Sequence, residues 1–471
     1  MLLNLLIKPC YLLLVEAEIQ NRVGAEVFGN YSALISLTFL INIFLDLGIN
    51  NYTSRTVAQS KNVVVKHLEH IAGLRLFLFA GYMLLLFVLA FILGYHGGDI
   101  TLLIWLGINQ TLAVTLLYFR ANLGGLLMFR KDAVISILDR GLLLIGLGGL
   151  LYYHRKEQYF DIYWLVKGQT VAYGITLLFA LFFLISKTGK IKIKWNFKVQ
   201  RSIIKQSLPY ALLFLLTMVY YKTDSIMLER MLPRGDFFAG IYAKGYRIFE
   251  ASNLLGFLFA TLLLPLFSRA LKAKEDVSPL AGNAFRLMIA GSSILVGLCA
   301  LFPGFLLSII YDNEIQETTP VFVTLMISFA FMLLTYLWGT LLTANGNLKS
   351  LNTIAICAVA LNISLNLLLI PIYQAWGSAI ASLVTQVAVT STQAFLCYRY
   401  RILRLRAKVW FTILLFLALF GTLSYFITII PMHIEFKVLS YPLIGLALAI
   451  AVGLLRIVDI RSLLSGREKR G

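Results

Sequence analysis

Long apolar stretches follow one another along almost the whole chain, and they set its fold class. Residues 74–94 read LRLFLFAGYMLLLFVLAFILG, with Arg75 as their one charged side chain. A run of this length is what an α-helix needs to cross the hydrocarbon core of a bilayer. A membrane β-barrel would instead alternate apolar and polar residues. The sequence therefore predicts an all-α, polytopic membrane protein.

About fourteen stretches of this kind can be placed along the 471 residues. Each has roughly the twenty residues that a membrane-spanning helix requires. The predicted helices lie near 3–21, 28–52, 71–94, 100–127, 133–153, 163–186, 207–231, 237–267, 285–311, 319–344, 349–370, 376–399, 409–430 and 438–458.

The basic residues indicate how these helices are oriented. The formal net charge is +19, from 41 Lys and Arg against 22 Asp and Glu. An even number of helices places both termini on one side, and the large basic clusters at 187–205, 269–274, 399–408 and 461–470 then share that side. Because cytoplasmic loops collect Lys and Arg, we expect both termini in the cytoplasm. The excess charge then needs no nucleic-acid partner to explain it.

A short motif occurs twice, once in each half of the chain. Residues 24–31 read GAEVFGNY and residues 235–242 read GDFFAGIY, both of the form G-x4-G-x-Y. Parallel repeats of helical bundles are a common transporter plan. We therefore expect two pseudo-symmetric lobes around a central cavity. The predicted parts are an N-terminal lobe at 1–186, a basic cytoplasmic linker at 187–206, a C-terminal lobe at 207–400, and two extra helices with a basic tail at 401–471.

The stretch 220–250 concentrates charge within apolar helices. It carries Lys222, Asp224, Lys244, Arg247 and Glu250, separated by a polar turn. A charge at the centre of a bilayer helix costs about 2.5–3.5 kcal/mol even on the mildest scale. Two readings follow: these side chains line a polar cavity, or they form buried ion pairs that fix the packing of the helices.

Three segments make the chain resemble polysaccharide flippases of the MATE-related superfamily, the Wzx-type O-antigen and capsule transporters. The first is RVGAEVFGNYSALISLTFLINIFLDLGINNYTSRTVAQ at 22–59. The second joins KTDSIMLERMLPRGDFFAGIYAKGYRIFE at 222–250 to LLPLFSR at 263–269. The third runs from 341 to 383 and contains an Asn-rich helix, an Ile-Pro turn and a small-residue helix. The resemblance covers essentially the whole chain.

This resemblance implies a bacterial inner-membrane protein that moves undecaprenyl-diphosphate-linked oligosaccharide from the cytoplasmic to the outer leaflet. Its partners would be that lipid-linked oligosaccharide, membrane lipids and other polysaccharide-assembly proteins. The diphosphate requires positive charge in the cavity, since an unpaired phosphate is costly in apolar surroundings. The candidate cavity residues are Lys8, Arg22, Arg120, Lys167, Lys222, Asp224, Lys244, Arg247 and Glu250.

Acidic residues in the same helices are candidates for binding a coupling proton or cation. They are Glu16, Glu18, Asp46, Asp139, Asp224 and Glu250. The alternative for Asp46 is a helix-end role beside Gly48, and for Asp139 a pair with nearby basic groups. We expect no catalytic residues, no metal and no cofactor, and the chain lacks the G-x4-G-K-[ST] motif of direct ATP use.

Three other functions compete with this interpretation. A MATE-type antiporter of drugs or metabolites would have about twelve helices and a less basic interior. A lipid II flippase would use the same mechanism on a different cargo. A membrane enzyme such as a polymerase or ligase would need a large outward loop, and the longest predicted one, His154 to Tyr163, has only about ten residues.

Overall fold

The computed structural model describes residues 7–50, 53, 64–126, 128–154, 160–189, 194–403 and 407–455. All regular elements within these residues are helices. Among the described residues, eleven runs are long and apolar enough to cross a membrane. Two of them, Ile7–Asp46 and Leu348–Arg399, each contain a kink that joins two predicted helices. Dividing both at their kinks and adding α9 (Phe197–Met231) brings the eleven to the fourteen predicted segments, which confirms the all-α membrane fold.

Backbone contacts divide the chain into two compact units, Met1–Ala243 and Lys244–Gly471. The boundary falls inside α10 (Gly235–Lys272), a single helix that contributes its first turns to the first unit and the rest to the second. The lobes predicted at 1–186 and 207–400 stay a prediction. Part of the predicted linker, 190–193, and most of the basic tail, 456–471, lie outside the described residues.

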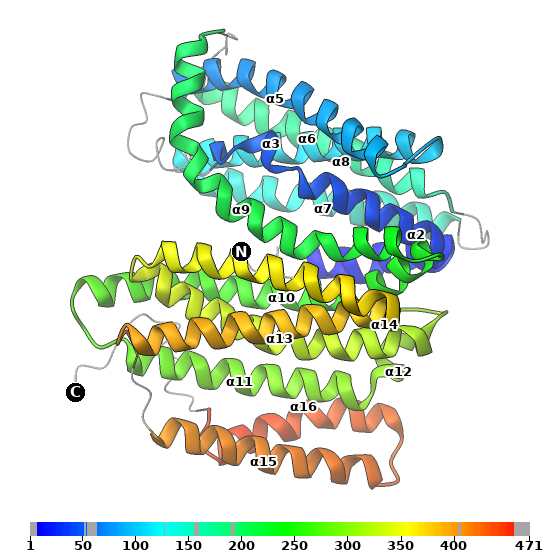
Figure 1. Ribbon diagram of the computed structural model, residues 1–471, viewed down its shortest axis with the longest axis vertical. Helices are drawn as coiled ribbons and strands as arrows, with labels where there is room; N and C mark the ends of the chain where they lie inside the picture. Colours follow the sequence, from blue (N-terminus) through cyan, green and yellow to red (C-terminus); the bar gives the residue numbers. More distant parts are fainter. Residues whose placement is uncertain are drawn as a thin grey trace. The chain divides into compact units, whose positions relative to one another are not determined.

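The first unit packs its helices in both parallel and antiparallel pairs, and α6 and α8 run parallel because Tyr163 contacts Gly98 while Thr170 contacts Asn109. Within it α6 lies against α8, α2 against α9, and α7 against α8 (Figure 1). Its elements are the π-helix η1 (Tyr11–Glu16), α2 (Ala17–Leu40), α3 (Ile43–Asp46), α5 (Val64–Ile92), α6 (Gly98–Gly125), α7 (Phe129–Tyr153), α8 (Ile162–Thr188), α9 and the start of α10.

The first two predicted helices differ from expectation in their boundaries. A kink at Gly24, with φ of 82°, separates them, because a positive φ is readily adopted by glycine. The second segment was expected to continue to residue 52, but α2 ends at Leu40 and α3 ends at Asp46. Leu47 and Gly48 then adopt left-handed backbone conformations that stop the helix.

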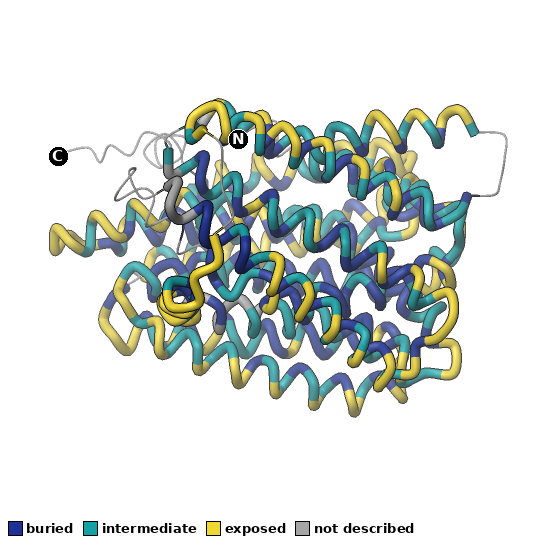
Figure 2. The backbone as a smooth tube through the Cα atoms, turned by 90° about the horizontal axis from the view of Figure 1, so that it is seen from above, coloured by how far each residue is buried: buried dark blue, intermediate teal, exposed yellow. Residues whose placement is uncertain are grey.

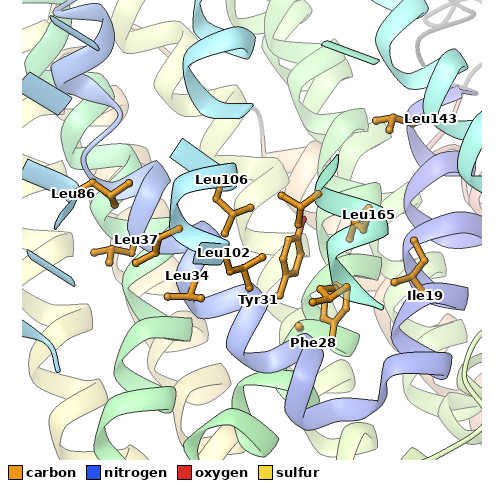
Figure 3. Close-up of a cluster of buried hydrophobic side chains, with 14 of the residues drawn as sticks. Ile19, Phe28, Tyr31, Leu34, Leu37, Leu86, Leu102, Leu106, Leu143 and Leu165 are labelled. Carbon is orange, nitrogen blue, oxygen red and sulfur yellow. The ribbon is translucent and has the colours of Figure 1, made fainter. Parts of the chain in front are cut away.

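The core of the first unit lies where α2, α6 and α8 meet. Phe28, Tyr31 and Leu34 of α2 pack with Leu102 of α6 and Leu165 of α8, all of them buried (Figure 3). Many helical residues are exposed (Figure 2), and a large share of them are apolar. An apolar exterior over a packed apolar interior is the pattern of helices that face lipid.

The second unit holds the rest of α10 and the remaining helices. The predicted single helix at 285–311 is wrong, because the structure has two helices there. The first, α11, ends at Leu301, and Pro303 begins the second, α12. The elements are α11 (Ser278–Leu301), α12 (Pro303–Ser308), α13 (Ile315–Ala344), α14 (Leu348–Arg399), α15 (Ala407–Ile429) and α16 (Ile434–Ala451).

The last two helices dock onto α11 of the same unit. The buried Tyr441 of α16 lies against Gly297, where an added β-carbon would stand 2.2 Å from the Tyr441 hydroxyl oxygen. That hydroxyl also shares a 2.7 Å hydrogen bond with Ser424 of α15. The two extra C-terminal helices are thus packed as part of the second unit.

Candidate functional site

The two copies of the repeated motif pack directly on each other within the first unit. An ideal β-carbon added at Gly29 would stand 1.7 Å from the carbonyl oxygen of Asp236. One added at Gly240 would stand 2.0 Å from the carbonyl oxygen of Ala25. The backbones of α2 and α10 therefore touch, and only glycine fits at either position.

This contact is reciprocal. Gly29 and Gly240 are the sixth residues of their motifs, and Ala25 and Asp236 are the second residues. Each sixth residue thus meets the second residue of the other copy, as a local two-fold axis requires. The Gln20 side chain donates a 2.9 Å hydrogen bond to the Gly240 carbonyl and adds a polar tie across the crossing. The two copies of the motif therefore contact each other symmetrically, while the pseudo-symmetry of two whole lobes stays a prediction.

Lys222 and Asp224 of α9 point to different neighbours. The Lys222 ammonium lies 5.0 Å from the ring centroid of Phe39 on α2. Asp224 is buried, and its carboxylate accepts a 2.7 Å hydrogen bond from the hydroxyl of Tyr242, the last residue of the second motif. Asp224 thus holds α9 to the start of α10, while Lys222 contacts α2.

Lys244 and Arg247 are both buried in the second unit, where partners from the α12–α13 connection surround them. The Lys244 ammonium lies 2.5 Å from a carboxylate oxygen of Glu314 and donates to the carbonyl of Asn313 at 2.7 Å. Arg247 donates to the Tyr311 hydroxyl at 3.1 Å, and that hydroxyl donates to the Lys244 carbonyl. Lys244 therefore takes part in a buried ion pair, the second of the two readings.

Glu250 differs in its exposure from Lys244 and Arg247, which precede it by six and three residues on the same helix. Its side chain is exposed, whereas Lys244 and Arg247 are buried. The roles of these three residues in substrate binding or ion coupling stay predictions.

The Lys244–Glu314 pair gives a test of stability. We expect Glu314→Gln to destabilise the protein by about 2–4 kcal/mol, because it leaves a buried ammonium without its counter-charge. The double variant Lys244→Met/Glu314→Gln removes both charges and should recover most of that loss. Thermal unfolding of the purified protein measures both. Equal stability of the single and double variants would contradict the importance of the pair.

Arg22 uses its guanidinium to join α2 to the end of α7. It pairs with Glu18 at 2.8 Å and donates to the carbonyls of Leu151 and His154, each at 3.1 Å. These carbonyls end α7, so the cation also lies at the negative end of a helix dipole. Arg22 and Glu18 thus have structural partners, and their predicted transport roles stay untested.

Asp46 has the helix-end contact considered for it. Its carboxylate accepts the backbone N–H of Asn50 at 3.2 Å and lies 3.3 Å from an Arg75 nitrogen. Arg75 also donates to the Asn50 side chain at 2.7 Å and lies 4.3 Å from the ring centroid of Tyr118. This network joins α3, α5 and α6.

The remaining basic candidates lie on different helices of the first unit. Arg120 pairs with Asp132 at 2.7 Å between α6 and α7. Lys167 is exposed, and its ammonium lies 5.9 Å from the ring centroid of Trp105. Lys8 is half-buried and interacts electrostatically with Arg140, Asp139 and Arg120. The structure thus brings Lys8 near both Arg120 and Arg140.

Arg140 of α7 is the centre of a polar group that we call the Arg140 cluster. Its guanidinium carbon lies 5.0 Å from the ring centroid of Tyr11 and 6.0 Å from that of Tyr173. It interacts electrostatically with Tyr173, Asp139 and Glu16. The cluster consists of Lys8, Tyr11, Glu16, Asp139, Arg140 and Tyr173.

The π-helix η1 explains how Tyr11 and Glu16 both reach this cluster. In an α-helix, residues five apart point about 140° away from each other. The i→i+5 bonding of a π-helix widens the turn and brings such residues toward one face. Tyr11 and Glu16 are the first and last residues of η1, and both interact with Arg140. π-Helical turns occur frequently at functional sites.

The Arg140 cluster has one buried donor without a hydrogen-bond partner among the described residues, the Tyr11 hydroxyl. The Tyr11 hydroxyl is buried and makes no hydrogen bond within them, since the neighbouring Gln169 amide donates to the Tyr31 hydroxyl at 3.4 Å. Arg140 itself is only half-buried. A planar guanidinium, an ammonium and a phenol in apolar surroundings can together hold an oxyanion such as phosphate.

Sequence reasoning selected Lys8 and Glu16 but missed Arg140. The residue stands beside Asp139 within the apolar stretch 133–153, where the pair reads as mutually compensating. In the structure Asp139 accepts the backbone N–H of Arg140 at 2.8 Å, and the guanidinium extends toward Tyr11 and Tyr173. An arginine in the middle of a membrane helix was the signal that could have found it.

Comparison with known proteins agrees with this architecture. A family model described as polysaccharide biosynthesis protein matches residues 13–271, more than half of the chain. An uncharacterized membrane protein of Methanocaldococcus jannaschii is 25% identical over 401 residues, covering 82% of this chain and 92% of the relative.

Two solved structures show the same fold. The lipid II flippase MurJ in an inward closed conformation has a TM-score of 0.76 at 13% identity, covering 99% of this chain and 100% of that one. A multidrug resistance MATE family transporter of the MOP superfamily, inward-facing, has a TM-score of 0.62 at 14% identity, covering 85% and 94%. The MurJ and MATE fold is therefore confirmed for this multi-pass membrane protein.

Proposed function

The chain belongs to the polysaccharide biosynthesis protein family, and its fold is that of a known flippase. We therefore propose that it flips undecaprenyl-diphosphate-linked oligosaccharide. The glycolipid passes from the cytoplasmic to the outer leaflet by alternating access of two lobes around a central cavity. The protein acts as a Wzx-type transporter in the bacterial inner membrane, with both termini in the cytoplasm. Other polysaccharide-assembly proteins supply the glycolipid and consume it.

The observation that carries this proposal is the Arg140 cluster. A diphosphate must lose its hydration to enter the membrane, and it needs charged donors in compensation. Arg140 offers a planar fork that matches phosphate oxygens, and Lys8 offers a second cation. The Tyr11 hydroxyl, which makes no hydrogen bond within the described residues, supplies a neutral donor beside Arg140. Together they can hold the headgroup on the side of the first unit.

Two other functions compete with this proposal. A lipid II flippase would differ in its cargo, and a MATE-type antiporter would differ in its architecture. The MATE transporter structure covers 85% of this chain, whereas the MurJ structure covers 99% of it. That difference favours a flippase over an antiporter. Lipid II remains the second candidate cargo, since it carries the same diphosphate on the same kind of lipid.

Among the carboxylates considered for ion coupling, Glu16 is the one we assign to this role. It lies within the Arg140 cluster and interacts electrostatically with Arg140, Tyr11 and Tyr31. Asp46 and Asp224 are held by Arg75 and Tyr242 respectively. A carboxylate close to the headgroup site is the one whose proton occupancy the cargo can alter.

A deletion strain tests the proposed function. Loss of the gene should deplete surface polysaccharide and accumulate lipid-linked oligosaccharide that only cytoplasmic-side reagents can reach. Drug sensitivity should stay unchanged, and the gene supplied in trans should restore the polysaccharide. Arrested peptidoglycan synthesis with normal surface glycan would assign lipid II instead. Raised drug sensitivity with normal glycan would assign an antiporter.

A further inference from the structure

The start of α9 carries an exposed basic face that none of the transport residues uses. Phe197, Lys198, Arg201, Lys205 and Leu208 are all exposed there. At 100° per residue they occupy an arc of about 100° on the helix. The buried residues of the same turns, Gln200, Ile203 and Ser207, lie on the opposite side. The exposed side of these turns therefore combines three cationic residues with two apolar ones, Phe197 and Leu208.

The length of α9 places this face near the membrane surface. The helix has 35 residues, which span about 52 Å, against about 30 Å for the hydrocarbon core. The long apolar run of α9 begins at Leu208. Residues 197–207 therefore extend roughly 16 Å beyond it, into the layer that phospholipid headgroups occupy.

Contacts to α5 fix which way the face points. Lys194 pairs with Glu69 at 2.6 Å, and Gln200 donates to the carbonyl of His70 at 3.2 Å. The Trp195 ring lies against Gly73, where an added β-carbon would stand 3.4 Å from it. The side of the segment that turns toward α5 is thus occupied, and the basic side stays open.

Two large aromatic side chains flank the basic residues. Trp195 is 65% exposed and Phe197 is 80% exposed, at the junction where the chain enters α9. Aromatic rings and basic side chains at one level of a helix are typical of a segment that lies at a lipid interface. Within the described part of the chain, Lys198, Arg201 and Lys205 form no ion pair, so their charge is available.

We propose that Lys198, Arg201 and Lys205, flanked by Trp195 and Phe197, bind the anionic phospholipid headgroups of the leaflet that they meet. Three cations on one side of a helix match a negatively charged lipid surface. The aromatic residues hold the segment at the depth where the cations reach the phosphates. This surface is separate from the headgroup site of the cargo and does not depend on it.

Native mass spectrometry of the detergent-solubilised full-length protein tests this proposal. Titration with phosphatidylglycerol and with phosphatidylcholine should show tighter binding of the anionic lipid. Lys198→Gln/Arg201→Gln/Lys205→Gln should weaken the strongest phosphatidylglycerol step tenfold or more, because each basic residue at an anionic surface contributes about fivefold. High salt should weaken binding to the unaltered protein in the same way.

The matched control removes three exposed basic residues elsewhere, Arg269→Gln/Lys272→Gln/Lys274→Gln, and should leave the strongest step unchanged. The charge-preserving variant Lys198→Arg/Arg201→Lys/Lys205→Arg keeps the test valid if the first variant fails to fold, and it should bind as the unaltered protein does. Equal losses in the two Gln triples, or no preference for phosphatidylglycerol, would overturn the proposal. So would equally strong competition by inorganic phosphate or by an acidic peptide, since either would make the face a general anion or protein site.

Discussion

Gly240→Ala is expected to prevent the protein from reaching its folded state, and Gly29→Ala is expected to do the same. A β-carbon at position 240 would stand 2.0 Å from the Ala25 carbonyl oxygen, and one at position 29 would stand 1.7 Å from the Asp236 carbonyl oxygen. Both obstacles are backbone atoms, so no side chain can rotate away to relieve them. Because overpacking that shifts backbone costs about 3 kcal/mol or more, folded protein should fall to a small fraction of the normal level.

Gly146→Ala is the matched control for both variants. Gly146 lies within α7 of the same unit and has nothing within 4 Å of its added β-carbon. Alanine there should be neutral or stabilising by up to about 1 kcal/mol, as for other exposed helix interiors. Size-exclusion chromatography of the expressed protein measures all three. A normal yield of folded Gly240→Ala would show that α2 and α10 do not cross at these residues.

Arg140→Gln is expected to lower surface polysaccharide export tenfold or more while the amount of protein in the membrane stays normal. Hydrogen bonds to a charged group contribute about 1.5–3 kcal/mol, which corresponds to a ten- to hundredfold change in affinity. Arg140→Lys keeps the charge but loses the planar fork, so it should restore export only in part. Export per molecule of membrane protein is the quantity to measure.

Arg399→Gln serves as the control for this experiment, because Arg399 is an exposed arginine at the end of α14 in the second unit. It should leave export unchanged. Tyr11→Phe removes only the buried hydroxyl, which makes no hydrogen bond to any described residue, and we expect a smaller loss than for Arg140→Gln. Normal export by Arg140→Gln would remove the Arg140 cluster from the transport site.

The sequence was sufficient for the helices and the repeat because both depend on local patterns. Apolar length identified the spans, and the spacing of Gly24, Gly29 and Tyr31 recurred at Gly235, Gly240 and Tyr242. The contact between the two copies could not be predicted from the sequence, because a motif does not show which other segment its backbone contacts. The break of the predicted helix 285–311 was not predicted. The sequence shows Pro303, but it does not show whether this proline bends one helix or begins another.

The interior charges could be located from the sequence but not paired. Lys244 stands among the charges of 220–250, yet its partner Glu314 lies 70 residues further along the chain. Arg140 was not selected from the sequence because the adjacent Asp139 suggested a neutral pair. The turn that brings Tyr11 near Arg140 is a π-helix. The segment YLLLVE carries no local pattern that distinguishes a π-helical turn from an α-helical one.

Translocation by the purified protein is the most direct measurement of the central account. Proteoliposomes would carry polyprenyl-diphosphate-linked oligosaccharide with a fluorescent sugar, and a membrane-impermeant quencher would report how much reaches the opposite leaflet. We predict that the unaltered protein moves the glycolipid between leaflets, that Arg399→Gln does so equally well, and that Arg140→Gln does so at least tenfold more slowly. Equal rates for vesicles with the unaltered protein and vesicles without protein would contradict the proposed function. Equal rates for the unaltered protein and Arg140→Gln would contradict the assigned site.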